Sequence, residues 1–382
     1  MGNPSHAPLE VHIPADHGAT EMLFASGDEV VVKPRRYPGD TYPPLWFYFG
    51  VRAPAGRPPG ALRVVIQGLT PGAETYEPFW KHCLWAREGE PWERIPEVAQ
   101  RYGETTLTVE AELPPGGRLW IAETYPLPWG WYRDLYRELA GPPAAGLRFD
   151  RWTAGYSVQG RPVEAFRIRR EGPLPERTVM FLAGQHAVEQ SGKIFAETVL
   201  RGYHSGRFAG TPMGRLLETH GVVVIPLANP DGCYDGRMNS NAAGEVMDAA
   251  TDDSPEMRAA LSVAEEFRPA VLVNCHGWGN AWGQPPYEDL YRWSDEDALF
   301  AYLRAHVPGC SSSASSHWLG DQFRLENEAR RRWGTECIIT ELNWNSYLPP
   351  EGGPPVRPTR AQIEHRAVEY LTAIAQYLEE KG

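Results

Sequence analysis

The chain has 382 residues, of which 42% are hydrophobic and 23% charged, and its formal net charge is -12 at pH 7. This length predicts two domains, or one large domain with an addition. An acidic chain without a basic cluster argues against nucleic-acid binding. No segment reaches the roughly 18 apolar residues of a membrane span, so we expect no membrane partner.

The cysteines and the start of the chain bear on location. Residues 1–18 show neither a cationic start nor an apolar run, so we expect no signal peptide. The five cysteines form no CxxC pair: Cys83, Cys233, Cys275, Cys310 and Cys337. We therefore expect neither a disulfide framework nor a thiolate zinc site, and the cytoplasm is the expected compartment.

Residues 1–20 are polar and are expected to be flexible. Between residues 21 and 140 short β-like runs alternate with Gly and Pro, which predicts a β-sandwich domain. The runs are 29–33, 45–51, 62–66, 105–109 and 119–122, followed by a short helix over 131–139. The many aromatic residues of this region fit an aromatic core or domain interface better than a sugar-binding platform.

After a Gly- and Pro-rich hinge at 141–146 the pattern changes, and a second domain is expected over 147–382. Strand-like and helical runs now alternate, which predicts an α/β fold: a mostly parallel mixed sheet with helices on both faces. The expected strands are 162–169, 179–183, 221–227, 270–274 and 337–340. The expected helices are 187–203, 255–267, 295–307, 320–332 and 360–380.

Polar residues follow the expected strands where each one ends. They are His186 and Glu189, then Arg237 beyond an Asn-Pro-Asp-Gly turn, then His276, and last Glu341. In open α/β sheets, ligands bind outside the carboxyl ends of the strands. An isolated HxxE motif is weak, but four strands that deliver such residues to one edge predict a reaction centre.

The chemistry of these residue types indicates a catalytic zinc site. Two His and one Glu can hold zinc and leave a fourth position for water. A separate carboxylate is needed to move the proton of that water, and Glu341 is the candidate. Glu336 is its rival, although it precedes the expected strand. Arg237 is the candidate for stabilising the oxyanion.

Several segments resemble the zinc carboxypeptidases of the M14 type: GQHAVEQS, VIPLANPDG, NCHG, TEL and the segment 155–163. The stretches PRRYPGDTYPPLWFYFGV and AETYPLPW resemble the cytosolic carboxypeptidase subfamily, which has an N-terminal β-domain. The resemblance implies one zinc ion held by His186, Glu189 and His276. It also implies that Glu341 is the general base and Arg237 the oxyanion-stabilising arginine.

One departure from the family concerns substrate binding. The resemblance implies an Asn-Arg pair that grips the terminal carboxylate, but Asp248 and Ala249 stand on the matching positions. The cation could come from elsewhere, with Arg258 and Arg324 as candidates, or no free carboxylate is bound. Asp248 favours an amine or a neutral group, or is a solvated loop carboxylate.

Other residues are candidates for contact with the substrate. Asn239 and Asn241 could position it, although Asn in a turn needs no function. The family also uses a tyrosine from a late loop, and the sequence does not choose among Tyr287, Tyr291 and Tyr347.

The expected function is zinc-dependent hydrolysis of an amide bond, with a peptide C-terminus or an acylated amino acid as the substrate. Two alternatives stay open: a non-peptidase amidohydrolase or deacylase at the same site, and a catalytically silent zinc-containing binding protein. The presence of Glu341 favours an enzyme, because a binding protein needs no general base.

Overall fold

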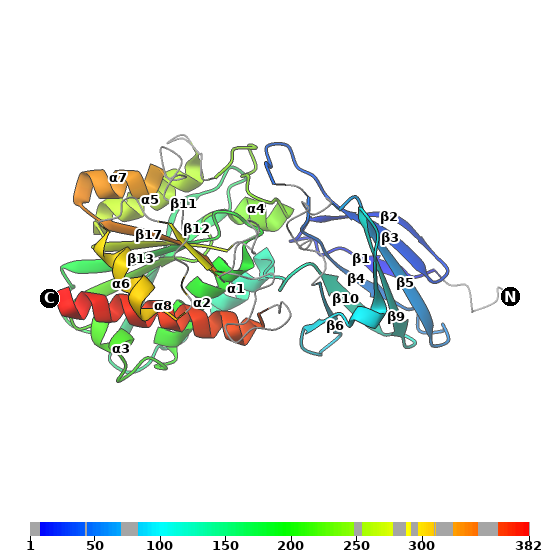
Figure 1. Ribbon diagram of the computed structural model, residues 1–382, viewed down its shortest axis with the longest axis horizontal. Helices are drawn as coiled ribbons and strands as arrows, with labels where there is room; N and C mark the ends of the chain where they lie inside the picture. Colours follow the sequence, from blue (N-terminus) through cyan, green and yellow to red (C-terminus); the bar gives the residue numbers. More distant parts are fainter. Residues whose placement is uncertain are drawn as a thin grey trace.

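The computed structural model describes residues 8–42, 44–69, 83–247, 254–277, 288–291, 297–308, 310, 324–342 and 358–381. Within these residues a β-rich N-terminal region lies beside an α/β region that contains the C-terminal helix (Figure 1). The α/β fold preceded by β-sheets, which the sequence predicted, is confirmed.

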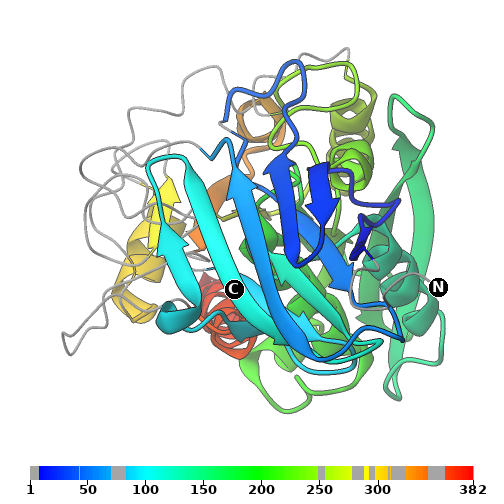
Figure 2. The same ribbon diagram turned by 90° about the vertical axis from the view of Figure 1, so that its right-hand side faces the viewer.

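The N-terminal region contains two five-stranded sheets, seen from their own side in Figure 2. The first has the order β1 (Glu10–His12), β4 (Tyr48–Arg52), β10 (Arg118–Ala122), β6 (Leu84–Arg87) and β7 (Glu93–Arg94). The second has the order β2 (Thr20–Ser26), β3 (Glu29–Pro34), β5 (Gly60–Gln67), β9 (Thr106–Leu113) and β8 (Gln100–Tyr102), with a 3-10 turn at Glu97–Ala99.

Apolar side chains of both sheets belong to one core. In β3 and β5 buried and less buried residues alternate, as expected for strands with one face on a core. Trp46, Phe47 and Phe49 are buried in this core, so for these three aromatic residues the structural interpretation holds. Others of the aromatic set, such as Trp80, lie outside the described residues.

The segment 8–20 is packed against the rest of the region, contrary to the expectation of a flexible N-terminus. Strand β1 pairs antiparallel with β4, and the side chain of His17 is fully buried against Trp46 and Tyr48. The sequence did not show this, because a three-residue strand carries too little periodicity to be recognised.

Helix α1 (Trp129–Glu138) leads to a seven-stranded sheet. Its order is β11 (Leu147–Tyr156), β12 (Pro162–Arg170), β14 (His220–Ile225), β13 (Arg177–Ala183), β15 (Val271–His276), β17 (Glu336–Leu342) and β16 (Glu288–Tyr291). The four strands β14, β13, β15 and β17 are parallel, whereas β11, β12 and β16 pair antiparallel. The sheet is therefore mixed, with a parallel centre.

Helices cover both faces of this sheet. One core joins it to α2 (Gln190–His204), α3 (Pro212–Leu216), α6 (Ala298–His306) and α8 (Arg360–Lys381). A second core joins it to α5 (Pro255–Phe267) and α7 (Arg324–Trp333). In β15, Val271 and Val273 belong to the first core and Leu272 to the second, as the alternation of a strand requires. None of the described helices is both long and apolar enough to cross a lipid bilayer.

Helix α2 differs in two respects from the amphipathic helix expected over 187–203. It begins at Gln190, because residues 186–189 form a turn, and it is buried on nearly every side. Even Lys193 is fully buried, with Nζ donating to the carbonyl of Ala187 at 2.7 Å and lying over the Trp46 ring. Burial lowers the pKa of this lysine to about 8.

Candidate metal centre

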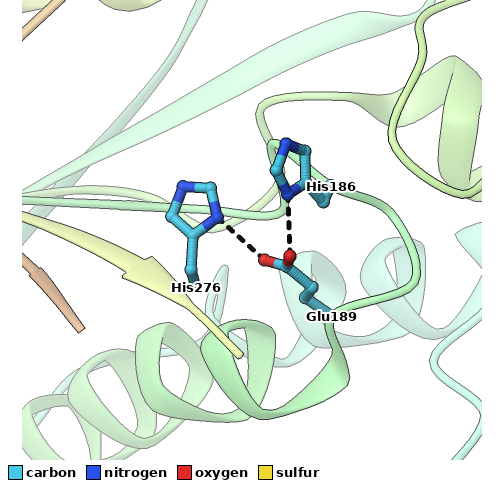
Figure 3. A group of neighbouring side chains, drawn as sticks. All are labelled: His186, Glu189 and His276. Carbon is cyan, nitrogen blue, oxygen red and sulfur yellow. Dashed lines mark hydrogen bonds and ion pairs between the residues drawn. The ribbon is translucent and has the colours of Figure 1, made fainter. Parts of the chain in front are cut away.

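Three side chains converge at the carboxyl ends of β13 and β15 (Figure 3). The two oxygens of Glu189 each face an imidazole nitrogen: Nδ1 of His186 lies 2.7 Å away and Nδ1 of His276 lies 2.8 Å away. All three side chains are buried, and their candidate ligand atoms lie within 4.8 Å of one another. Among the residues that the structure describes, this is the only such cluster of three metal-ligating groups.

The turn before α2 explains why His186 and Glu189 meet. The φ of Gly184 is +67°, in the left-handed region that glycine adopts readily, and it turns the chain out of β13. The amide of Glu189 then donates to the carbonyl of His186 at 3.2 Å, which brings both side chains to one side.

Close backbone contact brings His276 to the same place. A Cβ built on Gly277 would lie 1.8 Å from Oγ of Ser191, so a larger residue at this position would displace that hydroxyl. The amide of Gly277 donates to Glu189 Oε2 at 3.2 Å, and Ser191 Oγ donates to the carbonyl of Leu342 in β17 at 2.7 Å. Three elements are thereby held together around the cluster.

The charges of the cluster suit a cation. Burial alone raises the pKa of Glu189, but attraction and hydrogen bonds from His186 and His276 outweigh burial and lower that pKa well below its usual value. The carboxylate therefore stays ionised between two buried imidazoles. Two His nitrogens and one carboxylate are a donor set that zinc uses in catalytic sites, so the residues present fit the metal.

Glu341 lies on the strand beside His276. The register of β15 and β17 pairs these two residues directly, and alternation directs both side chains to the face of α5 and α7. The rival, Glu336, is the first residue of the same strand and pairs with Val271 at the opposite edge. Its carboxylate there accepts a hydrogen bond from Tyr377 at 2.6 Å and binds Lys381, so it lies away from the cluster.

The family comparison agrees with this geometry. Residues 148–245 match the family model Peptidase M14, zinc carboxypeptidase. The matched part contains His186 and Glu189, whereas His276 and Glu341 lie beyond it. No curated protein matches the chain in sequence.

Solved structures with the same fold cover almost the whole chain. A metallo-carboxypeptidase from Burkholderia cenocepacia has a TM-score of 0.76 at 17% identity, over 98% of this chain and 100% of that one. A metallo-carboxypeptidase from Pseudomonas aeruginosa, in complex with (2-guanidinoethylmercapto)succinic acid, has a TM-score of 0.75 at 19% identity, over 97% and 99%. The fold is that of metallocarboxypeptidases, and together with the matched domain it supports a zinc-dependent hydrolase.

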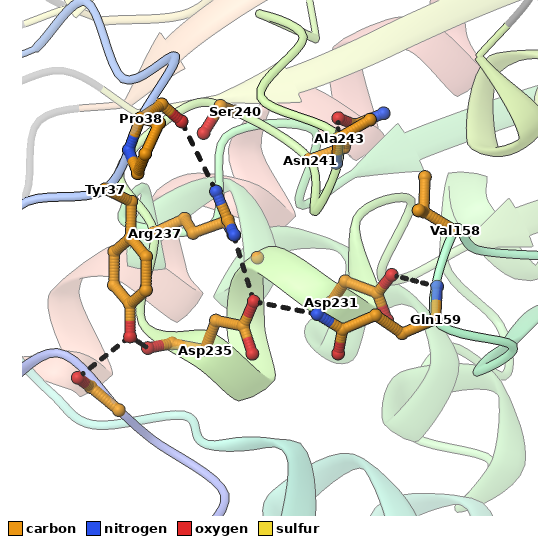
Figure 4. Close-up of polar contacts among 12 residues, drawn as sticks. Tyr37, Pro38, Val158, Gln159, Asp231, Asp235, Arg237, Ser240, Asn241 and Ala243 are labelled. Atoms are coloured by element: carbon orange, nitrogen blue, oxygen red, sulfur yellow. Dashed lines mark hydrogen bonds and ion pairs between the residues drawn. The ribbon is translucent and has the colours of Figure 1, made fainter.

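Arg237 follows the short helix α4 (Pro230–Asp235), and its described contacts are with this helix and the N-terminal region (Figure 4). Its guanidinium pairs with Asp235 at 3.0 Å, donates to the carbonyl of Pro38 at 3.4 Å and lies 4.6 Å from the Tyr37 ring centroid. These contacts hold the side chain at the boundary of the two regions. A role toward an oxyanion stays a prediction.

Asn239 and Asn241 are buried, and their side chains are occupied by the protein itself. Asn239 accepts from the amide of Thr41 at 3.1 Å and donates to its hydroxyl at 2.7 Å. Asn241 donates to Glu245 and Glu256, and it accepts from two amides of its own loop. Substrate binding by either residue stays a prediction.

The remaining specificity candidates are Asp248, Arg258, Arg324 and the three tyrosines. Asp248, Tyr287 and Tyr347 lie outside the described residues. Arg258 is an exposed residue of α5, and the side chains of Arg324 and Tyr291 lie outside the described part of the chain.

The sequence did not predict the part that the N-terminal region plays here. The Tyr42 ring lies edge-on to the His186 ring, with 5.5 Å between centroids. The carboxylate of Asp40 accepts from the amides of Met238, Asn239 and Ser240 at 3.1, 3.3 and 3.1 Å. Nothing local in the sequence indicates these contacts, and those of Asp40 join positions about 200 residues apart.

Proposed function

We propose that the chain is a zinc-dependent metallocarboxypeptidase-like hydrolase that removes C-terminal residues from peptides or proteins. The observation that carries this proposal is the buried convergence of His186, Glu189 and His276 at the edge of the sheet, with Glu341 beside His276 on the neighbouring strand. The matched zinc carboxypeptidase domain supports the choice of metal and reaction.

His186 and His276 would hold one zinc ion through Nδ1, and Glu189 through its carboxylate, because these atoms face one another. Zinc bound there supplies a water of near-neutral pKa and polarises the carbonyl group of the substrate. Glu341 accepts a proton from the attacking water while the water oxygen bonds to the carbonyl carbon. Glu341 then transfers that proton to the amide nitrogen while the C–N bond breaks.

Substrate specificity is proposed to differ from that of a carboxypeptidase that binds the terminal carboxylate of its substrate through an arginine. The position expected to carry that arginine is Ala249, next to Asp248. The guanidinium of Arg237 is engaged by Asp235 and Tyr37. A substrate end that is neutral or amine-bearing fits this charge pattern better than a free carboxylate, so an acylated amino acid or side-chain amide is the second candidate substrate class.

Membership of the subfamily with an N-terminal β-domain is part of the proposal. Its support is that the similar structures cover the β-rich region as well as the α/β region. The cytoplasm is the proposed compartment, because the cysteines are free and four of the five are buried, which fits a reducing environment.

The test is cleavage of a substrate panel by zinc-loaded protein, followed by mass spectrometry. The panel pairs each peptide having a free C-terminus with its C-terminally amidated form and adds N-acyl amino acids. We expect cleavage that chelation abolishes and zinc restores. If protein with stoichiometric zinc cuts no member of the panel, the proposed function is wrong and the silent zinc-binding alternative stands.

Variants of β17 assign the general base. Glu341→Gln removes the proton acceptor, so kcat should fall by about 10²–10⁴-fold with zinc content unchanged. Glu336→Gln is the matched control, because it changes the same residue type at the other end of the same strand. Equal activity of the two variants would show that Glu341 is not the base.

A further inference from the structure

Three buried polar side chains lie behind His276, on the side away from Glu189. Gln185 precedes the first metal-ligand candidate, Asn274 stands two residues before His276 in β15, and Glu326 belongs to α7. Their exposed fractions are 3%, 0% and 1%. Buried polar groups cost free energy unless they are hydrogen-bonded, so the partners of these three require an account.

Hydrogen bonds connect the three side chains in a row that ends at the histidine. Nδ2 of Asn274 donates to Glu326 Oε1 and to Gln185 Oε1, both at 2.6 Å. Gln185 Oε1 lies 3.1 Å from Nε2 of His276. The row therefore runs from a carboxylate through two amides to the imidazole.

The direction of these bonds is fixed by chemistry. Nε2 of Gln185 faces the carbonyl oxygen of Met247 at 3.3 Å, and a carbonyl oxygen only accepts. The amide oxygen of Gln185 must then be the atom that faces His276. An amide oxygen also only accepts, so Nε2 of His276 must carry the proton that it receives.

This row determines which nitrogen of His276 is available to a metal. With the proton on Nε2, the lone pair of a neutral His276 is on Nδ1, which faces Glu189 Oε2 at 2.8 Å. In this tautomer Nδ1 and the carboxylate oxygen both present lone pairs, so together they suit a bound cation.

We propose that Gln185, held by Asn274 and Glu326, is a positioning residue that fixes His276 in the tautomer protonated at Nε2 and so presents Nδ1 to zinc. The inference rests on the zinc site of the proposed function, but not on any hydrolytic activity. Partners that hold the second nitrogen of a metal-ligating histidine typically contribute 10–100-fold to metal affinity.

The test compares three variants in the full chain. Gln185→Met keeps a similar volume but removes the acceptor. Gln185→Glu keeps an acceptor for His276, so it serves as the rescue variant. Gln190→Met is the matched control, because Gln190 is also buried, at the start of α2, but donates to the carbonyls of Ala187 and Val188 instead of accepting from the histidine.

Zinc affinity is measured by competition with a chromophoric chelator, and thermal melting of the metal-free protein measures the structural cost of each change. We expect a 10–100-fold loss of zinc affinity in Gln185→Met, recovery to within about threefold in Gln185→Glu, and no loss in Gln190→Met. A purely structural role would lower the melting temperature without this selective loss of affinity.

The tautomer itself is read from ¹⁵N-histidine NMR of the zinc-loaded protein, where we expect the proton of His276 on Nε2. The inference is overturned if that proton is on Nδ1, if zinc affinity of Gln185→Met stays within twofold of wild type, or if wild type binds no zinc. If wild type binds zinc and shows the expected tautomer and variant pattern but cleaves no amide, only the proposed function fails.

Discussion

The carboxylate of Asp40 connects the N-terminal region to the loop beside the candidate metal centre, and its removal is the most informative perturbation. It accepts three backbone amides of residues 238–240 and the hydroxyl of Ser240 at 2.6 Å. The carbonyl of Met238 in turn accepts a hydrogen bond from the amide of Val188 at 3.3 Å. Val188 lies between His186 and Glu189 in the chain. Loss of Asp40 should therefore weaken both the fold and the metal centre.

The magnitude follows from what Asp40→Ala leaves behind. Met238, Asn239 and Ser240 have exposed fractions of 3%, 1% and 0%, so water replaces the lost acceptor poorly. Each hydrogen bond to a charged group contributes about 1.5–3 kcal/mol, and the contributions of one carboxylate overlap. We expect the free energy of unfolding to fall by about 3–5 kcal/mol.

The assay is urea unfolding of the metal-free protein, combined with zinc affinity from chelator competition. Asp16→Ala is the control, because Asp16 also accepts a backbone amide, that of Gly130 at 2.7 Å, but at the start of α1. It should cost about 1 kcal/mol and leave zinc affinity unchanged. The reasoning is refuted if Asp40→Ala destabilises no more than Asp16→Ala and binds zinc like wild type.

Three further outcomes are expected. Gly277→Ala places a Cβ against Ser191, so the variant should lose about 1–3 kcal/mol of stability and bind zinc more weakly in the same competition assay. Adding Ser191→Gly should recover part of the stability and part of the zinc affinity. If the effects of the two substitutions simply add, the close contact between these residues is contradicted. Zinc at 100 times its Kd should raise the free energy of unfolding by about 2.7 kcal/mol, and a melting temperature indifferent to zinc would argue against the site. Burial lowers the pKa of His17 to about 3. Below pH 6.5 the unfolded chain therefore binds a proton that the folded chain does not. From this residue alone, the free energy of unfolding should fall by about 2 kcal/mol between pH 7 and pH 5. Urea unfolding of His17→Phe should show a pH difference smaller by that amount, and an unchanged difference would show that His17 does not titrate on unfolding.

Much of the fold could be predicted because helices and strands show short-range periodicity of apolar residues. Helix α5 begins and ends at the residues expected from the 3.6-residue period, and the expected runs at 179–183 and 337–340 lie within β13 and β17. The edge strand β11, which pairs antiparallel with β12, was not expected from the sequence, because it alternates partly exposed residues and offers no apolar run. Strand β1 was missed for lack of length.

The sequence by itself determined the candidates for the metal centre, because residues that follow parallel strands must share one edge of the sheet. His186, Glu189 and His276 could be named from that rule, and the structure brings their side chains together. The same rule ranked Glu341 above Glu336, because Glu336 precedes the expected strand 337–340. In the structure the two residues lie toward opposite ends of β17.

Only the tertiary structure decided how that centre is supported. Asp40 and Ser240 are 200 positions apart, and Gln185 and Asn274 are 89 apart, so no local periodicity connects them. The contacts of Arg237 with Pro38 and Tyr37 of the N-terminal region likewise depend on tertiary packing. A sequence pattern reports the face of an element, whereas the hydrogen-bond partner of a buried side chain depends on which elements pack against it.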